Sequence, residues 1–489
     1  MIIFGIIFLY AITRLINLDK WPIFSDEGIY INWAHVAWKD AAWRFISVTD
    51  GRQPLQTWAT IPFLKLFPQN FLFAGRLFSV STGFVALTGT VSFMFYLWGK
   101  RAAFIGGLIY VFMPYFLFYD RMALVDSAVN AGFIWILFFS VLLIRERRLD
   151  IAFTLGFIGG FALLAKSSSR MFLMLSLFAP TLFLKTKNNN IRNIISKSIN
   201  YWVLLGFAFG ISLFFYNVQR LSPYFHYVGL KNNTFVMTFA EFIQTPFAYA
   251  HNFHRIPLYV AWESGWVIIP FSLLGMYKLY KKEIGLFVYL LIFLLLPYIT
   301  IGLFAKILFG RYILFFGSLI LIFATYFFQQ YKPHKYLAIM LGFLILSMVY
   351  FDYQLMFNPV RANFPPVDRG QYVDGVTAVW GADDLMKYLQ DKAKTKDILV
   401  LAEGNFGLIA DVLKVYSKEN DNVEIKGLWP LEEKNIYEYL PELKNRDVYV
   451  VFSHRQEIPS QWPIKLIKKY ERPNGDKATS LYRYINNNE

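Results

Sequence analysis

Acidic side chains stand where the chain has just left its first apolar run. The stretch WPIFSDEGIYINW contains the adjacent acids Asp26 and Glu27. Charge beside a membrane core is costly and is usually functional when it faces a cavity. A carboxylate in such a place can take the proton of an attacking hydroxyl group, as a general base does. The structural alternative is a solvated loop with no chemical role.

Two further stretches carry polar residues at the ends of apolar runs. DGRQPLQTW places Arg52 and Gln53 before a proline, and YDRMALVDSAVNA contains Asp120, Arg121 and Asp126. Asp126 can act in catalysis, or it can cap the helix that follows it. Asp120 and Arg121 can contact a substrate, or they can form a local ion pair. The sequence leaves both alternatives open.

Cations follow in two later stretches. AKSSSR supplies Lys166 and Arg170, and AKILFGRY supplies Lys306, Arg311 and Tyr312. Basic side chains at membrane level can snorkel to lipid phosphates. They can also form a specific anion site, because Arg and Lys are the usual partners of phosphate groups.

Carboxylates and cations at the ends of apolar runs on the same side of a membrane are suited to group transfer from a lipid-linked phosphate. Lys and Arg would hold the phosphate and stabilise its charge as the glycosidic bond breaks, while a carboxylate would accept the proton of the incoming hydroxyl. His251 and His254 have the spacing of a metal-binding pair, but the sequence offers no third ligand beside them. A sugar-binding surface or a plain loop is the alternative for these histidines.

Composition indicates the elements that must position these residues. The 489 residues are 56% hydrophobic and 17% charged, and they contain no cysteine. This balance is typical of a polytopic helical membrane protein, and it excludes disulfides and thiolate metal sites. We predict eleven membrane spans, at 2–18, 72–97, 103–119, 127–144, 151–165, 171–184, 199–218, 263–280, 284–304, 312–330 and 335–352.

The basic connections between these spans predict the topology. Every second connection is short and basic, and such connections are usually cytoplasmic. The residues that define this side are Lys100, Arg101, Arg145, Arg147, Arg148, Lys185, Lys187, Arg192, Lys197, Lys278, Lys281, Lys282, Lys332 and Lys335. The N-terminus is then inside, and the five polar stretches and the C-terminal tail are outside, in a multi-pass protein of the plasma (inner) membrane.

Two domains are expected, residues 1–352 in the membrane and residues 353–489 outside it. The tail alternates strand patterns with helix patterns, which predicts a small α/β domain with a largely parallel sheet. The predicted strands are 397–402, 422–428, 447–453 and 480–485, and the predicted helices are 382–393, 407–417 and 431–440. The segments 27–38 and 54–68 are too short to span a bilayer and read as interfacial helices.

The order of these motifs resembles the GT-C glycosyltransferases, over roughly residues 1–330. The shared features are the first-loop acid pair, Arg76 in AGRLFSVSTG, the R-x-A-L-x-D stretch at 121–126, the lysine after a glycine-rich span and the Arg-Tyr pair at 311–312. Within this group the chain resembles the protein O-mannosyltransferases, the lipid A aminoarabinose transferase and their bacterial homologues. The resemblance implies a GT-C membrane domain that moves a sugar from a polyprenyl-phosphate donor to a hydroxyl acceptor on the extracytoplasmic face, as an inverting hexosyl- or mannosyltransferase.

The resemblance also assigns residue roles. It implies that Asp26, with Glu27 beside it, and Asp126 are catalytic, and that Lys166 and Arg311 hold the carrier phosphate. From their local chemistry we add Arg52, Gln53, Arg121, Arg170 and Tyr312 as residues that bind the phosphate or substrate. Many members carry His-Pro or Glu-Lys-Pro where this chain has Arg52-Gln53-Pro54, so a carboxylate metal ligand is absent there. No cofactor is therefore expected to be required and no metal ligand is assigned, while a requirement for a divalent metal stays open. The expected partners are the donor lipid, the membrane and an acceptor protein, lipid or glycan, without nucleic acid.

Two other functions remain open from the sequence. A transporter or flippase of an anionic lipid-linked saccharide would also need charged residues at membrane level, although such proteins often show two related halves. A non-catalytic assembly protein would use residues 353–489 to recruit partners.

Overall fold

The computed structural model describes residues 2–184, 191–331, 335–404, 408–418 and 421–485. These residues fold as two compact units, each built from separate stretches of the chain. The first unit contains residues 1–16, 45–56 and 79–356, and the second contains residues 17–44, 57–78 and 357–489. This division differs from the expected boundary near residue 353, because parts of the first outer loop group with the C-terminal residues.

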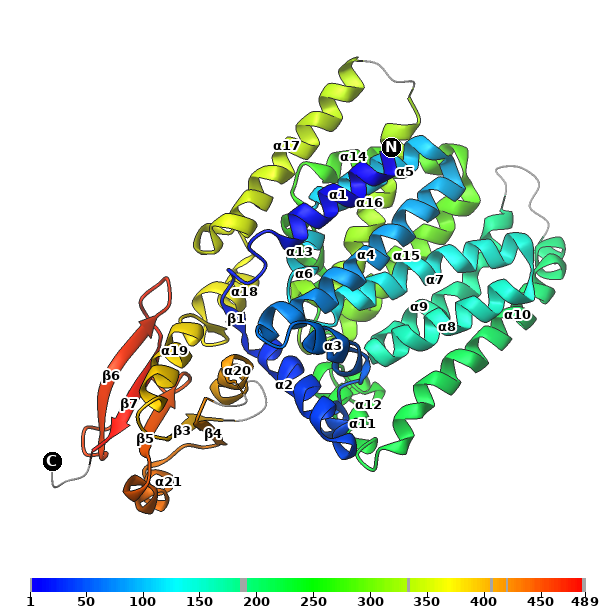
Figure 1. The fold of residues 1–489 in the computed structure, drawn as a ribbon. Helices are drawn as coiled ribbons and strands as arrows, with labels where there is room; N and C mark the ends of the chain where they lie inside the picture. The colour runs from blue at the N-terminus through cyan, green and yellow to red at the C-terminus, as the bar shows by residue number, and fades with distance from the viewer. Residues whose placement is uncertain (1, 185–190, 332–334, 405–407, 419–420, 486–489) are drawn as a thin grey trace. The chain divides into compact units, whose positions relative to one another are not determined.

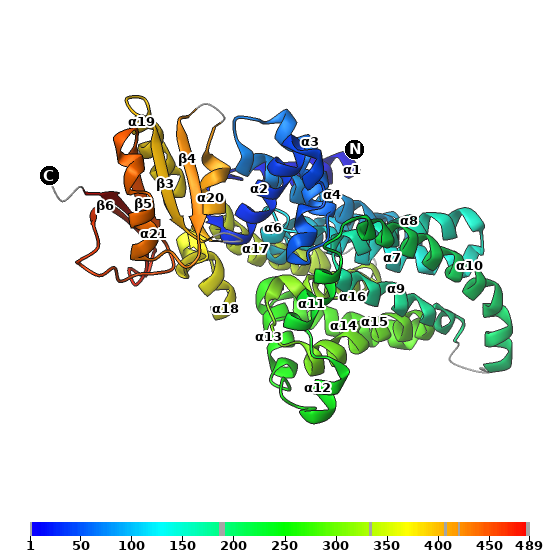
Figure 2. The ribbon, with the colours of Figure 1, turned by 90° about the horizontal axis from the view of Figure 1, so that it is seen from below.

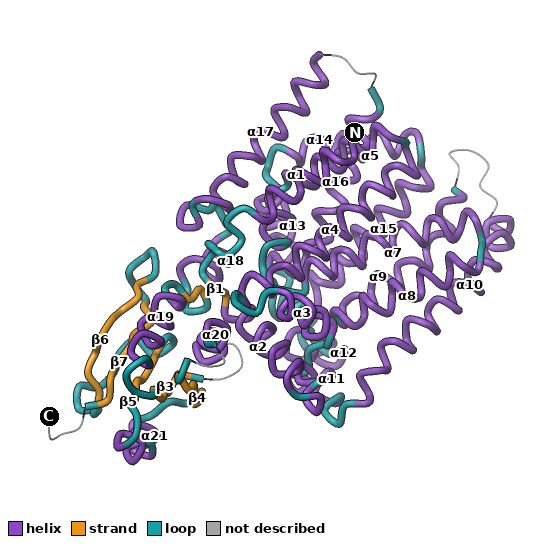
Figure 3. Tube along the Cα trace, in the orientation of Figure 1, coloured by secondary structure: helices purple, strands orange, loops and turns teal. Residues whose placement is uncertain are grey.

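The first unit is a bundle of apolar helices, which Figures 1 and 3 show as mostly long, roughly aligned elements. Its helices are α1 (Ile2–Leu15), α4 (Phe71–Trp98, which begins in the second unit), α5 (Lys100–Phe112), α6 (Pro114–Tyr119), α7 (Asp126–Glu146), α8 (Leu149–Ala165), α9 (Arg170–Leu175), α10 (Ile191–Asn217), α11 (His226–Phe235), α12 (Phe239–Gln244), α13 (Asn252–Ser264), α14 (Ile268–Lys282), α15 (Ile284–Phe304), α16 (Leu314–Gln329) and α17 (Lys335–Phe357).

The helices make this a multi-pass membrane protein. Among the described residues, six helices are long and apolar enough to cross a membrane, or seven if the bent pair α13 and α14 is one span. Each of the eleven predicted spans coincides with helical structure, but several of those segments are short or broken. Pro114 interrupts the third predicted span, and the sixth continues from α9 as a 3-10 helix that contains Pro180. The count of eleven crossings therefore stays a prediction. Lys185, Lys187 and Lys332 of the predicted inner side lie outside the described residues.

Glycine allows two of these helices to pack closely. α8 and α10 are neighbours along much of their length, and a Cβ added at Gly156 would lie 2.7 Å from the Ile211 side chain. Small residues let helix backbones approach in a membrane, where van der Waals packing has to supply the association.

The second unit contains a five-stranded sheet, orange in Figure 3. Its strands follow the order β4-β3-β5-β7-β6, in which β3 pairs in parallel with β4 and β5, and β7 pairs antiparallel with β5 and β6. The strands are β3 (Ile398–Glu403), β4 (Val423–Leu428), β5 (Asp447–Phe452), β6 (Ile464–Glu471) and β7 (Ala478–Tyr484).

Helices cover the central strands of this sheet. The helices of the tail are α18 (Pro366–Arg369), α19 (Ala382–Ala393), α20 (Ile409–Tyr416) and α21 (Glu433–Glu438). α19 and α20 pack on one face of β3, while Leu399 and Leu401 point into a core with Ile436 of α21. Every residue of β3 is buried, as expected for a strand covered on both faces.

The four predicted strands and three predicted helices of the tail are confirmed. The prediction of a largely parallel sheet is wrong in part, since the sheet is mixed. It also has a fifth strand, β6, whose residues IKLIKKYE place Lys465, Lys468 and Lys469 on an exposed edge. Lysines on an edge strand discourage pairing with other chains, and they also weaken the strand pattern in the sequence.

Most of the first outer loop, residues 19–71, belongs to this second unit, while its residues 45–56 belong to the first. Its strand β1 (Ile23–Phe24) pairs antiparallel with β2 (Ala378–Val379), and the Ser25 amide donates to the Thr377 carbonyl at 2.9 Å. Helix α2 (Ser25–Lys39) then packs on α20, where Asn32 donates to Asp411 at 3.0 Å. The helices expected at 27–38 and 54–68 exist as α2 and α3 (Leu55–Leu66), whereas their place at a membrane surface stays a prediction.

Candidate active site

The first-loop acids lie in the first turn of α2 and have different surroundings. Asp26 is half-buried, whereas the side chain of Glu27 is fully buried. Acids in the first turn are favoured by the helix dipole, which helps to explain why the helix begins here. Of these two neighbours, Asp26 keeps solvent-accessible surface and Glu27 has none.

Glu27 is held by Arg76 of α4. The Arg76 Nη2 and Nε atoms each lie 2.8 Å from a different Glu27 oxygen, and both side chains are 0% exposed. Glu27 also accepts the Phe24 amide at 2.9 Å. Arg76 donates further to the carbonyls of Leu18 and Trp21. This bidentate pair closes the first loop around a buried arginine, so we treat Glu27 as a positioning residue.

Four of the expected site residues meet in the first unit, and we call Asp126, Lys166, Arg311 and Tyr312 the cationic cluster. The Lys166 Nζ atom lies 2.9 Å from Asp126 Oδ1 and 4.0 Å from the centre of the Tyr312 ring. The Arg311 guanidinium lies 5.2 Å from the same ring. The lysine is 28% exposed and Asp126 is 6% exposed. Lys166 and Arg311 thus both lie against the Tyr312 ring, and Asp126 pairs with the lysine.

The adjacent residues Arg52 and Gln53 make different contacts. Gln53 donates to the hydroxyl of Ser167, the residue after Lys166. Arg52 pairs with Asp50 at 3.0 Å, and Asp50 also accepts Lys231 of α11 at 2.9 Å. Gln53 therefore reaches the cationic cluster through its neighbour, while Arg52 belongs to a separate ion-pair network in the same unit.

Two other expected cations lie apart from the cluster. Arg170 is exposed, and its guanidinium lies 5.1 Å from the centre of the Tyr216 ring. Lys306 bonds to Glu241 at 2.8 Å and to the Asn233 carbonyl at 2.9 Å. The hydrogen bond from Lys306 lowers the pKa of Glu241, which keeps that carboxylate charged. Lys306 is therefore already neutralised by a local partner.

The contacts of Arg121 indicate a structural role. It is 2% exposed and donates to the carbonyls of Thr13 at 2.8 Å and Ile16 at 2.8 Å, at the C-terminal end of α1. Cations at a helix C-terminus satisfy carbonyls that have no partner within the helix. The expectation that Arg121 binds phosphate is therefore not carried into the proposal below.

Asp120 pairs with Arg14 of α1, at 3.2 Å, and both side chains are fully buried. Sequence reasoning considered Arg121 as the partner of Asp120 and overlooked Arg14. The available signal was a charged residue inside an apolar run, which usually faces the interior of a bundle and has a partner there. Ser167 and Lys231 were also overlooked, and single serines and lysines in loops carry no such signal.

No three His, Asp or Glu side chains gather to hold a metal ion in the part of the chain that the structure describes. The described residues thus do not form a ready site for a divalent cation.

Solved structures with a similar fold exist for membrane enzymes. ArnT from Cupriavidus metallidurans in the apo state matches with a TM-score of 0.64 and 11% identity, over 99% of this chain and 97% of that chain. The same protein bound to undecaprenyl phosphate matches with a TM-score of 0.64 and 11% identity, over 99% and 98%. The oligosaccharyltransferase of Archaeoglobus fulgidus in complex with Zn and sulfate matches with a TM-score of 0.52 and 11% identity, over 92% of this chain and 67% of that one.

No family model matches the sequence, and no curated protein does. At 11% identity the structural likeness is a likeness of fold, and it extends over almost the whole chain. ArnT, a lipid A aminoarabinose transferase, and the archaeal oligosaccharyltransferase are both GT-C glycosyltransferases. The chain therefore has the GT-C fold, with a C-terminal sheet domain.

Proposed function

We propose that this protein is a membrane glycosyltransferase that moves a sugar from a polyprenyl-phosphate carrier to a hydroxyl acceptor on the extracytoplasmic side. The observation that carries the proposal is the cationic cluster, in which Lys166 and Arg311 share the Tyr312 ring. One ArnT structure with this fold is bound to undecaprenyl phosphate. Basic connections on the opposite side favour the extracytoplasmic placement.

The proposed reaction is a single displacement. The acceptor oxygen attacks the anomeric carbon, the bond from that carbon to the phosphate oxygen breaks, and the polyprenyl phosphate leaves with the electron pair. Asp26 takes the acceptor proton. Lys166 and Arg311 balance the charge that develops on the leaving phosphate. Attack from the opposite side inverts the anomeric centre.

The other residues have supporting roles. Asp126 holds Lys166 in place through their 2.9 Å ion pair, and Gln53 holds Ser167 beside it. Arg170 and Arg52 are proposed to contact the outer part of the substrate, and Glu27 fixes the loop that carries Asp26. A mannosyl donor is proposed from the resemblance alone, and the acceptor class is considered below.

Mass spectrometry of acceptors tests the proposal. The purified protein is incubated with defined polyprenyl-phosphate sugars and with membrane and envelope fractions as acceptors. We expect one donor to give products heavier by one sugar residue. If none of a broad set of hexosyl, pentosyl and aminopentosyl carriers gives a product, the proposal is contradicted.

Replacing Lys166 with Met should weaken the binding of undecaprenyl phosphate about 10- to 100-fold, because a charge-assisted hydrogen bond to the phosphate is lost. The measurement is a titration of the detergent-solubilised protein with undecaprenyl phosphate. A matched control is Lys306→Met, which removes a cation already paired with Glu241 and should leave this affinity unchanged.

A double variant separates phosphate binding from local ion pairing. Lys166→Met leaves Asp126 without its partner, so Lys166→Met with Asp126→Asn restores the local charge balance. If Lys166 contacts phosphate, binding stays weak in the double variant. Full recovery of binding would show that the lysine serves only to neutralise Asp126.

A further inference from the structure

A cavity of about 460 Å³ lies within the second unit, apart from the residues assigned above. Its walls come from the first loop at residues 19–23, the start of α4, helix α19 and the end of α20. This volume is within the usual range of small-molecule sites, roughly 300–1,000 Å³. Nothing in the proposed reaction accounts for it.

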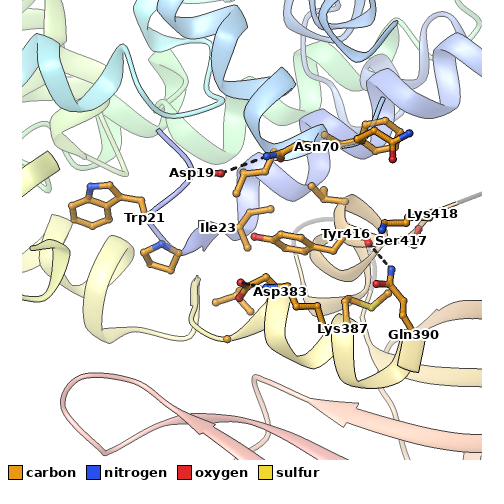
Figure 4. A pocket seen from close by; sticks show the side chains of 18 of the residues that line it. Asp19, Trp21, Ile23, Asn70, Asp383, Lys387, Gln390, Tyr416, Ser417 and Lys418 are labelled. Atoms are coloured by element: carbon orange, nitrogen blue, oxygen red, sulfur yellow. Dashed lines mark hydrogen bonds and ion pairs between the residues drawn. The ribbon is translucent and has the colours of Figure 1, made fainter. Parts of the chain in front are cut away.

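The lining combines aromatic surfaces with hydrogen-bonding groups of both kinds. Tyr416 lies in the middle of the cavity, with Asp19 and Asn70 on one side and Asp383 on the other (Figure 4). Trp21 and Trp380 add aromatic area. Tyr416 is half-buried, and burial raises its pKa, so its hydroxyl stays protonated.

This lining fits a saccharide better than a phosphate or a hydrocarbon chain. A sugar ring has apolar C–H faces that pack on aromatic rings, and hydroxyl groups around its edge that both donate and accept hydrogen bonds. Asp19, Asp383 and Gln390 offer oxygens to such donors, and Lys387 and Lys418 offer donors to sugar oxygens. A phosphate would face Asp19 and Asp383 as well as the lysines, and a hydrocarbon chain would separate the polar groups of the lining from water.

One wall of the cavity and the proposed general base, Asp26, lie on the same short segment of the chain. Ile23 lines the cavity, and Asp26 follows three residues later, at most about 11 Å along the chain. The backbone between them is fixed, because Ile23 pairs with Val379 and the Ser25 amide bonds to Thr377. A saccharide seated on the 19–23 wall is therefore held by the same rigid segment that presents Asp26.

We propose that this cavity is the subsite for the saccharide portion of the acceptor, so that the acceptor is a glycan or glycolipid rather than a protein side chain. The assignment of the saccharide as the acceptor rests on the proposed function. The binding of a saccharide at the cavity is argued from the lining residues alone.

Saturation-transfer NMR on the full-length protein in detergent tests the binding. The probes are the methyl glycosides of glucose, galactose, mannose and N-acetylglucosamine, with a tripeptide as a probe of the rival ligand class. The variants are Asp383→Ala and Lys387→Ala, whose side chains are exposed and form a 3.4 Å ion pair on α19. The matched controls are Asp391→Ala and Lys394→Ala, an exposed 2.7 Å pair at the C-terminal end of the same helix and outside the cavity lining.

We expect at least one glycoside to bind, with about three- to tenfold weaker binding in Asp383→Ala and Lys387→Ala and no change in the two controls. Tyr416→Phe should bind like the parent if the ring supplies packing, and Tyr416→Ala should lose binding. Equal binding in all four alanine variants, binding to the tripeptide alone, or no binding to any glycoside would overturn the inference.

Transfer kinetics distinguish this inference from the proposed function. With an active donor and acceptor, Asp383→Ala should raise KM for the acceptor about three- to tenfold and leave kcat unchanged. An unchanged KM would overturn the acceptor subsite and leave the glycosyltransferase proposal intact. Absence of transfer by the parent protein would overturn the proposed function, while the NMR result would still decide whether the cavity binds a saccharide.

Discussion

Replacing Asp26 with Asn should lower the rate of sugar transfer by about 10²–10⁴-fold and leave the affinity for undecaprenyl phosphate unchanged. The amide keeps the size and hydrogen-bonding reach of the side chain but cannot accept the proton of the acceptor hydroxyl. In the proposed function the carrier is held by the cationic cluster, whose four residues the substitution leaves in place. Initial rates at saturating donor and a direct carrier titration measure the two quantities separately.

A matched control for this variant is Asp40→Asn. Asp40 also lies beside α2, where its side chain accepts the Ala42 amide at 2.9 Å at the other end of the helix. It should transfer sugar like the parent protein. Parent-like turnover in Asp26→Asn would show that Asp26 is not the general base. Loss of both transfer and carrier binding would point to misfolding of the loop.

Replacing Glu27 with Gln should destabilise the first loop by about 3–5 kcal/mol, because it leaves the Arg76 guanidinium buried without a counter-charge. The pair is bidentate at 2.8 Å, and neither side chain is exposed. Arg76 also holds the Leu18 and Trp21 carbonyls, so the whole turn before α2 depends on it. Amide hydrogen exchange in residues 17–28 should accelerate about 10²-fold or more, as local opening becomes easier.

An exposed pair of the same chemistry provides the control for Glu27→Gln. Arg148 and Asp150 form a 2.6 Å ion pair whose side chains are both 63% exposed. Asp150→Asn should leave hydrogen exchange and the melting temperature unchanged, since exposed ion pairs contribute little. Parent-like exchange in residues 17–28 of Glu27→Gln would show that the pair does not hold the loop.

The helices of the membrane unit were predictable because their signal is local. Apolar runs of the right length predict spanning helices, since a backbone in lipid has to satisfy its own hydrogen bonds. The strands β3 and β5 were found for a similar reason, as short apolar runs that are buried on both faces. β6 was missed because Lys465, Lys468 and Lys469 give it the pattern of a solvated loop.

The grouping of the first loop with the tail could not be read from the sequence. β1 pairs with β2 across more than 350 residues, and each strand has only two residues, which leave no periodic pattern. Asn32 and Asp411, which form a hydrogen bond, are also more than 350 residues apart in the sequence. Contacts of this kind depend on side-chain fit between distant segments, and local propensity contains no information about them.

The sequence indicated which residues could form the candidate site, but it did not indicate which groups those residues contact. Lys166, Asp126 and Arg311 were chosen as charges beside apolar runs, and the structure brings them to one aromatic ring. The same criterion selected Arg121, which instead closes the end of α1. A charge in a membrane protein needs a partner, and the sequence does not tell whether that partner is a backbone carbonyl or a substrate.

The most direct measurement of the central claim is the ratio of polyprenyl phosphate released to sugar transferred, in liposomes that contain the purified protein, the donor lipid and an acceptor. A glycosyltransferase should release one polyprenyl phosphate for each sugar that appears on the acceptor. Movement of intact donor lipid to the other leaflet without release of polyprenyl phosphate, or no change in the donor at all, would contradict the account.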